Sequence, residues 1–207
     1  MSLIPPNNEK KVLLHSCCAP CSGALIEAML KSDIAVTLFY YNPNIQPEEE
    51  YKIRKEESRR FCEKMEISFV DAGYDPAHWV DNIKGYEGEP ERGNRCTICF
   101  DIRFERTAQY AFENDFTVFT SGLGISRWKD MDQINRCGQK AAELFPGITY
   151  WTQNWRKSGG SQRMSEIAKQ EEFYQQQYCG CIHSLKSANE WRKAQGRDEI
   201  QIGEDNY

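Results

Sequence analysis

Three cysteines within five positions follow a short apolar run near the start of the chain. Residues 12–14 are Val-Leu-Leu, and Cys17, Cys18 and Cys21 come soon after them. Residues 24–30 are rich in apolar side chains, so the pattern predicts a buried strand, a turn that carries the cysteines, and then a helix. The thiols are therefore expected at the carboxyl end of a strand and beside a helix N-terminus, where open α/β sheets bind ligands and where thiolates are favoured.

The rest of the chain alternates predicted strands with predicted helices. Further strands are expected at residues 34–41, 67–70, 116–121 and 148–151. Further helices are expected at residues 48–65, 76–83, 96–114, 129–144 and 162–177. This alternation predicts an α/β fold, a Rossmann-like doubly wound parallel sheet with helical additions. We expect a single domain over residues 1–207, with residues 1–10 as a short N-terminal tail and residues 187–207 as a charged C-terminal appendage.

The composition favours a protein of the cytoplasm. No apolar run approaches the length of a membrane span, and the first ten residues lack the apolar core of a signal peptide. In a reducing compartment, nine cysteines argue for metal ligation or redox catalysis and against a framework of structural disulfides. The mean hydropathy of −0.72 indicates a polar surface, which favours a monomer.

The charge is unevenly distributed along the chain. The net charge of −5 argues against indiscriminate binding of nucleic acid. Residues 92–163, however, carry eleven Lys and Arg against seven Asp and Glu, a net charge of +4. Because this segment also contains a second group of cysteines, it predicts a local anionic partner, although solvated helix faces produce the same bias.

The second group of cysteines consists of Cys96 and Cys99. They lie one turn apart at the start of a predicted helix, a spacing that suits zinc or an iron–sulfur cluster. Together with Cys17 and Cys18 they give four thiolates from two segments, which either close a zinc site or hold a [4Fe–4S] cluster. An adjacent pair of cysteines is atypical of structural zinc, so the spacing favours iron–sulfur.

The third group is Cys179 and Cys181, separated by one glycine. Two thiols at this spacing can form a small strained disulfide, which tends to be reducible and catalytic. We favour such a redox pair, with two more metal ligands as the alternative. Asp101 and Tyr178 lie next to cysteine groups and are candidate proton donors or groups that orient a ligand. His15 lies at a strand end and is expected to be a packed, hydrogen-bonded side chain.

A polar set follows the predicted strand that ends at residue 121. Arg127 and Lys129, with Ser126 before them, are candidates to hold phosphate, and Trp128 is a candidate to stack on a base. Arg163 lies at the end of a glycine-containing loop before a helix, where a helix N-terminus can bind phosphate. That loop lacks the Walker spacing, so ATP binding is not predicted. Solvated loops are the alternative for both segments.

Four ordered motifs, which span nearly the whole chain, resemble those of the QueH-type epoxyqueuosine reductases. They are His-Ser-Cys-Cys-Ala-Pro-Cys at residues 15–21, Arg-Cys-Thr-Ile-Cys at 95–99, Ser-Arg-Trp-Lys at 126–129 and Gln-Tyr-Cys-Gly-Cys at 177–181. The resemblance implies an adenine-nucleotide-hydrolase-like (HUP) sheet. It also implies reduction of epoxyqueuosine to queuosine at the wobble position of tRNA, the final step of queuosine biosynthesis.

The resemblance further implies roles for the cysteines. The ligands of a [4Fe–4S] cluster would be Cys17, Cys18, Cys96 and Cys99. Cys179 and Cys181 match the redox-active pair of the family, and Cys21 is a candidate ligand of a second, mononuclear iron. The partners would be a tRNA bearing epoxyqueuosine, contacted at its anticodon stem-loop, and an electron donor that the sequence does not identify. No membrane partner is expected.

Three other functions fit parts of the sequence. A tRNA sulfur-transfer enzyme on the same sheet needs ATP and a phosphate loop, and the cysteines follow the first strand where related ATP-pyrophosphatases carry Ser-Gly-Gly. A zinc-stabilised binding module would contain zinc and neither iron nor sulfide. Thioredoxin-like exchange by Cys96 and Cys99 is weakened, because the Trp and Pro context usual for that activity is absent.

Overall fold

The computed structural model describes residues 3–203 and contains a five-stranded sheet. The strands are β1 (Lys11–Ser16), β2 (Ala35–Tyr40), β3 (Ser68–Asp71), β4 (Val118–Ser121) and β5 (Thr149–Tyr150). Their order across the sheet is β3-β2-β1-β4-β5, and each neighbouring pair is parallel. These findings confirm the predicted α/β class with a parallel sheet.

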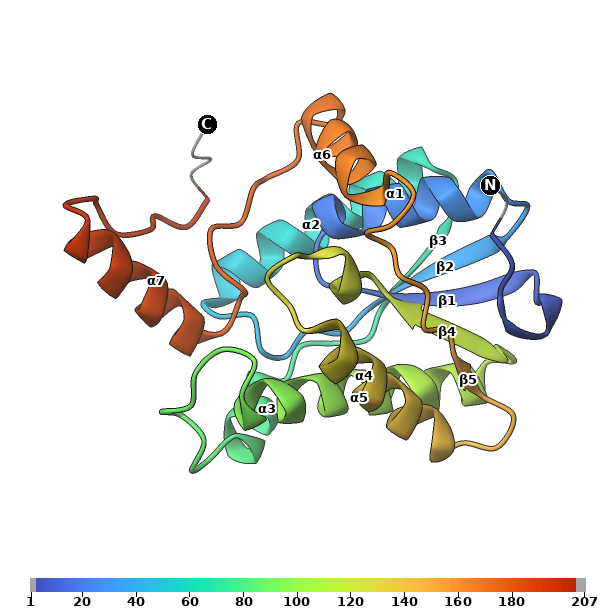
Figure 1. The fold of residues 1–207 in the computed structure, drawn as a ribbon, viewed down its shortest axis with the longest axis horizontal. Coiled ribbons are helices and arrows are strands. Elements are labelled where there is room, and N and C mark those ends of the chain that lie inside the picture. Colours follow the sequence, from blue (N-terminus) through green and yellow to red (C-terminus); the bar gives the residue numbers. More distant parts are fainter. Residues whose placement is uncertain (1–2, 204–207) are drawn as a thin grey trace.

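Helices cover both faces of the sheet (Figure 1). One face is covered by α1 (Ala19–Leu30), α2 (Glu48–Lys64) and α6 (Gly160–Gln170). The other face is covered by α3 (Pro76–Asn82), α4 (Asn94–Glu113) and α5 (Met131–Glu143). Helix α7 (Ile182–Ala194) lies beyond the carboxyl ends of the strands, and the short 3-10 helices are η1 (Pro6–Asn8) and η2 (Gly122–Ile125). Within residues 3–203, no helix has both the length and the apolar composition to cross a bilayer.

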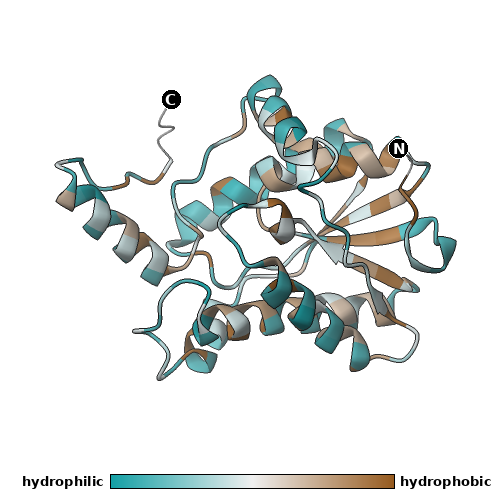
Figure 2. Cartoon of the chain, viewed as in Figure 1, coloured by the Kyte–Doolittle hydropathy of each residue, from teal (hydrophilic) through white to brown (hydrophobic). Residues whose placement is uncertain are grey.

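The sheet is buried on both faces, as in other doubly wound folds. Figure 2 shows hydrophobic residues along the strands and hydrophilic residues on the outer helix surfaces. In β1, the central strand, Val12, Leu13 and Leu14 have no exposed surface, which confirms the predicted buried run. The chain continues from β1 to one side of the sheet and later returns to the other side through β4. The topological switch point therefore lies at the carboxyl ends of β1 and β4.

Three helix boundaries differ from the predictions by more than two residues. Helix α1 begins at Ala19, directly after the cysteine pair, so Cys18 is its N-cap and Cys21 lies in its first turn. Helix α6 ends at Gln170, well before the predicted end, because the chain turns there to bury Phe173 completely. Helix α7 begins at Ile182, before the expected appendage, because the Cys181 side chain caps its N-terminus. Residues 1–2 and 204–207 of the predicted tail and appendage lie outside the described residues.

Gly138 of α5 allows this helix to pack closely on β5. A Cβ at position 138 would lie 2.6 Å from three ring atoms of Tyr150, and that ring is in contact with Phe104 and Phe119. Gly138→Val should therefore lower the free energy of unfolding by about 2 kcal/mol, a typical cost of overpacking, as measured by urea denaturation. Gly88→Val is the control, because no described atom lies within 4 Å of a Cβ there. Equal losses in both variants would contradict this packing argument.

Candidate functional site

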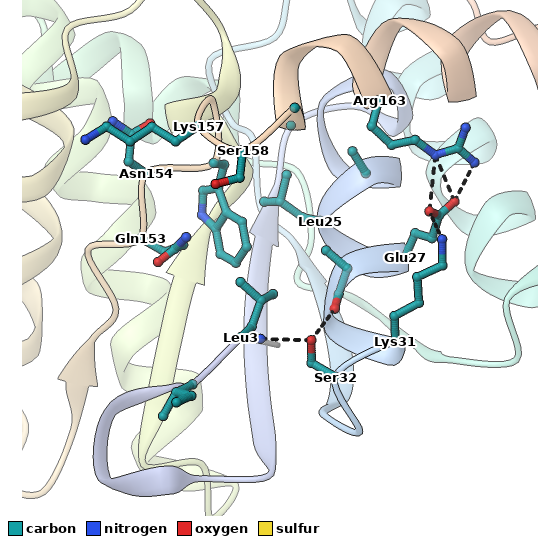
Figure 3. A pocket seen from close by; sticks show the side chains of 16 residues that line it. Leu3, Leu25, Glu27, Lys31, Ser32, Gln153, Asn154, Lys157, Ser158 and Arg163 are labelled. Carbon is teal, nitrogen blue, oxygen red and sulfur yellow. Dashed lines mark hydrogen bonds and ion pairs between the residues drawn. The ribbon is translucent and has the colours of Figure 1, made fainter. Parts of the chain in front are cut away.

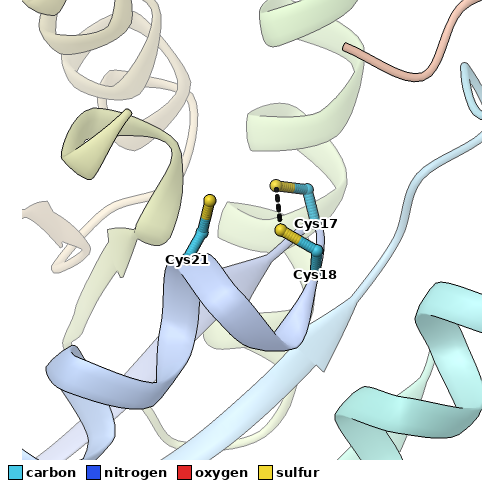
Figure 4. A group of neighbouring side chains, drawn as sticks. All are labelled: Cys17, Cys18 and Cys21. Atoms are coloured by element: carbon cyan, nitrogen blue, oxygen red, sulfur yellow. Dashed lines mark hydrogen bonds between the residues drawn. The ribbon is translucent and has the colours of Figure 1, made fainter. Parts of the chain in front are cut away.

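Three thiols meet at the carboxyl end of β1 (Figure 4). Cys17 follows β1 directly, Cys18 is the N-cap of α1, and Cys21 lies in the first turn of α1. Their sulfur atoms lie within 4.8 Å of one another, and all three residues are buried. Within residues 3–203, no other group of three Cys, His, Asp or Glu side chains is as compact. A buried set of soft sulfur donors without a carboxylate fits a soft metal ion or an iron–sulfur cluster.

Positive charges stabilise a thiolate in this group. Hydrogen bonds from the Cys18 and Cys21 thiols hold the pKa of Cys17 well below its usual value, and the charges of Arg103 and Lys129 act in the same direction against the cost of burial. Hydrogen bonding to Cys17, together with burial, raises the pKa of Cys18 and of Cys21. Of the three thiols, Cys17 therefore loses its proton most readily, and the thiolate is the form that binds metals.

His15 is a packed side chain, as predicted. Its Nδ1 lies 3.0 Å from Ser121 Oγ, and its Nε2 lies 3.3 Å from the carbonyl oxygen of Tyr41. Burial, followed by the charge of Arg103, lowers the pKa of His15 to about 3, so the ring is neutral. The ring connects the ends of β1 and β4 next to the cysteines.

The second group of thiols lies on α4. Cys99 is buried and Cys96 is partly buried, and burial raises the pKa of both. Arg103 follows on the same face of α4, with Nη1 4.0 Å from Cys99 Sγ and Nη2 donating to Asn42 Oδ1 at 2.6 Å. Because the charge of Arg103 also lowers the pKa of Cys17, one buried cation acts on both groups of cysteines. Cys96 and Cys99 are not part of the compact group of three.

The third group of thiols approaches from the C-terminal part of the chain. Cys179 Sγ accepts a hydrogen bond from Lys129 Nζ at 3.0 Å. Cys181 Sγ accepts one from the backbone N–H of Ser184 at 3.4 Å, and burial raises the pKa of this thiol. Cys181 packs in the same buried apolar cluster as Cys99, so the second and third groups meet. Across residues 3–203 every cysteine is a free thiol.

Two adjoining cavities connect the three groups. A cavity of about 490 Å³ is lined by cysteines of the first and third groups: Cys17, Cys21 and Cys179. A smaller cavity is lined by cysteines of the second and third groups: Cys96, Cys179 and Cys181. Trp128 and Lys129 line both cavities, which therefore adjoin along the loop between β4 and α5. Thiols from three distant segments are thus gathered at the carboxyl edge of the sheet.

A buried ion pair on α2 holds the third group. Arg54 Nη2 lies 2.6 Å from Glu50 Oε1, and both side chains are almost fully buried. The guanidinium also donates to the backbone carbonyls of Tyr178 and Cys179, each at 3.1 Å. Gly180 follows with a φ of +131°, and a Cβ there would lie 3.3 Å from Arg54 Nη1. Glycine is therefore needed between the two cysteines both for its conformation and for the space that Arg54 occupies.

Sequence reasoning did not identify Glu50, Arg54 or Arg103 as site residues, although a signal was present. Glu50 and Arg54 lie at i and i+4 on α2, on the face that also buries Ser58. Arg103 lies four residues after Cys99 and thus on the same face of α4. A charged side chain on a buried helix face needs a buried partner, so this pattern marks a polar site.

Two predicted site residues lie away from the cysteines. Asp101 Oδ2 pairs with Lys140 Nζ of α5 at 2.6 Å, because a residue two positions after Cys99 points to another side of α4. Arg163 pairs with Glu27 at 2.6 Å and lines a separate cavity of about 690 Å³ between α1 and the start of α6, shown in Figure 3. The structure does not bring either residue to the cavities that contain the thiols.

Tyr178 does lie at the site. It lines the larger cavity, and burial raises the pKa of its phenol. Its hydroxyl donates to the carbonyl of Gln46 at 2.6 Å, and the Gln46 N–H donates to the carbonyl of Gly180 at 2.8 Å. These two bonds anchor the third cysteine group to the segment between β2 and α2.

The predicted basic motif forms a well-held loop before α5. Ser126, Trp128 and Lys129 line the larger cavity, whereas Arg127 is exposed, with its guanidinium 4.8 Å from the Trp128 ring. Arg156 donates to the carbonyls of Ser126 and Lys129 at 2.5 and 2.8 Å. The loop therefore has a defined backbone next to Cys179.

Sequence comparisons point to one family. Residues 12–187 match the family model described as "Epoxyqueuosine reductase QueH". The chain is 62% identical to the epoxyqueuosine reductase QueH of Histophilus somni (strain 129Pt), over 96% of this chain and 82% of that protein. It is 61% identical to that of Acinetobacter baylyi, over 96% and 91% of the two chains, and 34% identical to that of Streptococcus pyogenes, over 94% and 75%.

Structural comparison supports the fold. A crystal structure of a predicted subunit of tRNA methyltransferase from Methanocaldococcus jannaschii is similar, with a TM-score of 0.50 and coverage of 94% of each chain. At 12% sequence identity this similarity concerns the fold alone.

Removal of the Arg54 charge should show how much the Glu50–Arg54 ion pair contributes to the free energy of unfolding. Arg54→Met leaves the Glu50 carboxylate buried without its partner, so the free energy of unfolding should fall by about 3 to 5 kcal/mol in urea denaturation. The double variant Glu50→Gln/Arg54→Met should recover part of that loss, because no unpaired charge remains. Alkylation of Cys179 should be faster in the double variant than in the unaltered protein, since the carbonyls of Tyr178 and Cys179 each lose a hydrogen bond. A double variant no more stable than Arg54→Met would contradict this account.

Proposed function

Because this chain belongs to the epoxyqueuosine reductase QueH family, we propose that it reduces epoxyqueuosine to queuosine at the wobble position of tRNA, as the final step of queuosine biosynthesis. The observation that carries the proposal is the gathering of thiols from three segments around two adjoining cavities. Such an arrangement can put metal ligands and a reducible thiol pair side by side. We expect the enzyme to act as a monomer in the cytoplasm, where its tRNA substrate is found.

We assign a [4Fe–4S] cluster to four of the thiols: Cys17, Cys18, Cys96 and Cys99. Two cations, Arg103 and Lys129, each act on cysteines of both segments, which supports one shared centre. Cys21, whose sulfur lies within 4.8 Å of the other two in its group, is the proposed ligand of a second, mononuclear iron. When bound, these metal centres would supply Lewis acidity toward the epoxide oxygen.

The electron balance of the reaction matches the pair Cys179 and Cys181. Removal of the epoxide oxygen as water, with formation of a carbon–carbon double bond, consumes two electrons and two protons. Two thiols that become one disulfide release two electrons and two protons. Epoxide and dithiol thus give alkene, water and disulfide. An external electron donor must then reduce the disulfide, by thiol exchange or by electron transfer through the metal centre.

Lys129 is proposed to position the sulfur of Cys179. Burial alone would lower the pKa of Lys129. The charges of Cys179 and Cys17 outweigh this effect and raise that pKa, so the Lys129 side chain stays an ammonium. Its Nζ lies 3.0 Å from Cys179 Sγ, so this hydrogen bond fixes the position of the sulfur at the wall of the cavity. Of the two predicted proton donors we retain Tyr178, which lines the cavity and would have to turn its hydroxyl from the Gln46 carbonyl toward the substrate, because Asp101 is paired with Lys140 elsewhere.

The basic segment is proposed to contact the anticodon stem-loop. Arg127 and Lys129 lie on the loop beside the cavity, where phosphate contacts would position the RNA, and Ser126 adds a hydroxyl. Trp128 offers an exposed ring on which a base can stack. Arg163 is left out of this contact, since it pairs with Glu27 at a separate cavity.

Anaerobic reconstitution tests the proposal directly. Protein loaded with iron and sulfide, given a chemical reductant and tRNA that contains epoxyqueuosine, should convert that nucleoside to queuosine, as measured by mass spectrometry of the digested tRNA. Omission of the reductant should stop the conversion after at most one turnover. Protein that takes up only zinc, or loaded protein that leaves epoxyqueuosine unchanged, would refute the proposal.

Serine substitutions separate the roles of the cysteines. Loss of the visible absorbance of the cluster is expected on substitution of any proposed ligand: Cys17, Cys18, Cys96 or Cys99. Cys179→Ser and Cys181→Ser should keep the absorbance and lose turnover, because only the thiol pair is affected. Cys62→Ala is the control, since this buried thiol of α2 lines neither cavity. If Cys21→Ser loses the absorbance and Cys96→Ser keeps it, the cluster belongs to the compact group of three instead.

A further inference from the structure

Two exposed tryptophans line the larger cavity. Trp128 is 66% exposed and Trp191 is 56% exposed, and both border the cavity whose wall contains Cys17, Cys21 and Cys179. They come from separate elements, the loop before α5 and helix α7. Large aromatic faces exposed together at an opening mark a site where a partner binds.

The Trp128 ring is held outward by a fixed backbone. Arg156 binds the carbonyls on both sides of this residue, those of Ser126 and Lys129. Arg92 Nε donates to the carbonyl of Trp128 itself at 3.0 Å. The exposure of this ring is therefore a consequence of how the loop is built.

Trp191 is tied to the cysteine segment through its helix. Its neighbour Arg192 donates to Gln177 Oε1 at 2.9 Å and to the carbonyl of Asp198 at 2.5 Å. Cys181 caps the N-terminus of the same helix. The Trp191 ring therefore has a defined position relative to Cys179 and Cys181, and α7 forms one side of the site.

Each tryptophan has an arginine beside it. The Arg127 guanidinium lies 4.8 Å from the Trp128 ring, and the Arg197 guanidinium lies 5.5 Å from the Trp191 ring. An aromatic face with an adjacent cation is the combination that binds single-stranded nucleic acid, because the ring stacks on a base and the cation meets the phosphate.

The size of the cavity determines which nucleotides can reach these rings. At about 490 Å³ it is in the range of pockets for one small ligand, roughly 300 to 1,000 Å³. It therefore accommodates one nucleoside turned out of its loop, and the bases on either side must stay at the opening. Those are the positions of Trp128 and Trp191.

We propose that Trp128 and Trp191 stack on the two unpaired bases that flank the modified nucleoside in the anticodon loop. The proposal rests on the proposed function and adds α7 to the RNA site. The two stacked bases would hold the loop open while the nucleoside between them reaches the thiols.

The test measures RNA binding without turnover. Reconstituted enzyme without reductant is titrated with an anticodon stem-loop that carries 2-aminopurine next to the wobble position, whose fluorescence falls when the base stacks on an aromatic ring. Trp191→Ala should raise the Kd by about tenfold, as expected for one lost stacked base, and should abolish the fluorescence change at one flanking position. Trp191→Phe should keep most of the affinity.

Two controls make the result specific. Phe112→Ala removes an aromatic ring that is 52% exposed on α4 but lines neither thiol cavity, and it should leave the Kd unchanged. A fully paired RNA of the same length should bind the Trp191→Ala variant as well as the unaltered enzyme. An unchanged Kd and fluorescence for Trp191→Ala would overturn the proposal, even if turnover falls. RNA binding that depends on Trp191 without any reduction of epoxyqueuosine would support stacking and refute only the proposed function.

Discussion

A buried thiolate at Cys17 is costly because it has lost its contact with water, and the site depends on cations that offset this cost. Arg103 and Lys129 both favour a thiolate at Cys17, and the charge of Arg54 acts on Cys18 in the same sense. These cations come from α4, the loop before α5, and α2. Each of these cations also contacts another part of the chain. The same side chains therefore hold the elements of the site in place and set its electrostatics.

Arg54 shows how this constraint reaches the C-terminal part of the chain. Its two carbonyl acceptors, at Tyr178 and Cys179, lie more than a hundred residues further along the sequence. Since Glu50 neutralises the guanidinium on the other side, Arg54 can stay buried while it binds backbone oxygens. The segment with Cys179 and Cys181 is therefore bound to α2, and α7, whose N-cap is Cys181, is positioned through that segment.

Most strands and the first cysteine group were predictable because they are local. Val12 to Leu14 form a buried run, and a helix start after such a run puts Cys17 and Cys18 at the sheet edge in any doubly wound fold. The early end of α6 was not predictable, because it is decided by the burial of Phe173 against other elements. The direction in which the Asp101 side chain points was also not predicted, because it depends on the face of α4 on which this residue lies.

Asp101 is adjacent in sequence to the Cys96 and Cys99 pair, yet its partner is Lys140 on another helix. Nearness along a helix does not mean a shared face, since residues two apart point in widely different directions. The same geometry makes Arg103 a member of the site. The spacing of residues along the predicted helix would have assigned Arg103 to the site and excluded Asp101. Adjacency to the cysteine motif selected Asp101 instead.

The N-terminus of α1 lies at the switch point of the sheet, a position where helix ends commonly bind phosphate through their unpaired N–H groups and partial positive charge. The same field also favours a thiolate over a thiol. In this chain Cys18 is the N-cap and Cys21 lies one turn later. The partial positive charge that would favour a bound phosphate therefore acts on the cysteine sulfur atoms instead. The fold supplies an anion site, and the residue type at the first turn decides whether the anion is a bound phosphate or a thiolate of the chain itself.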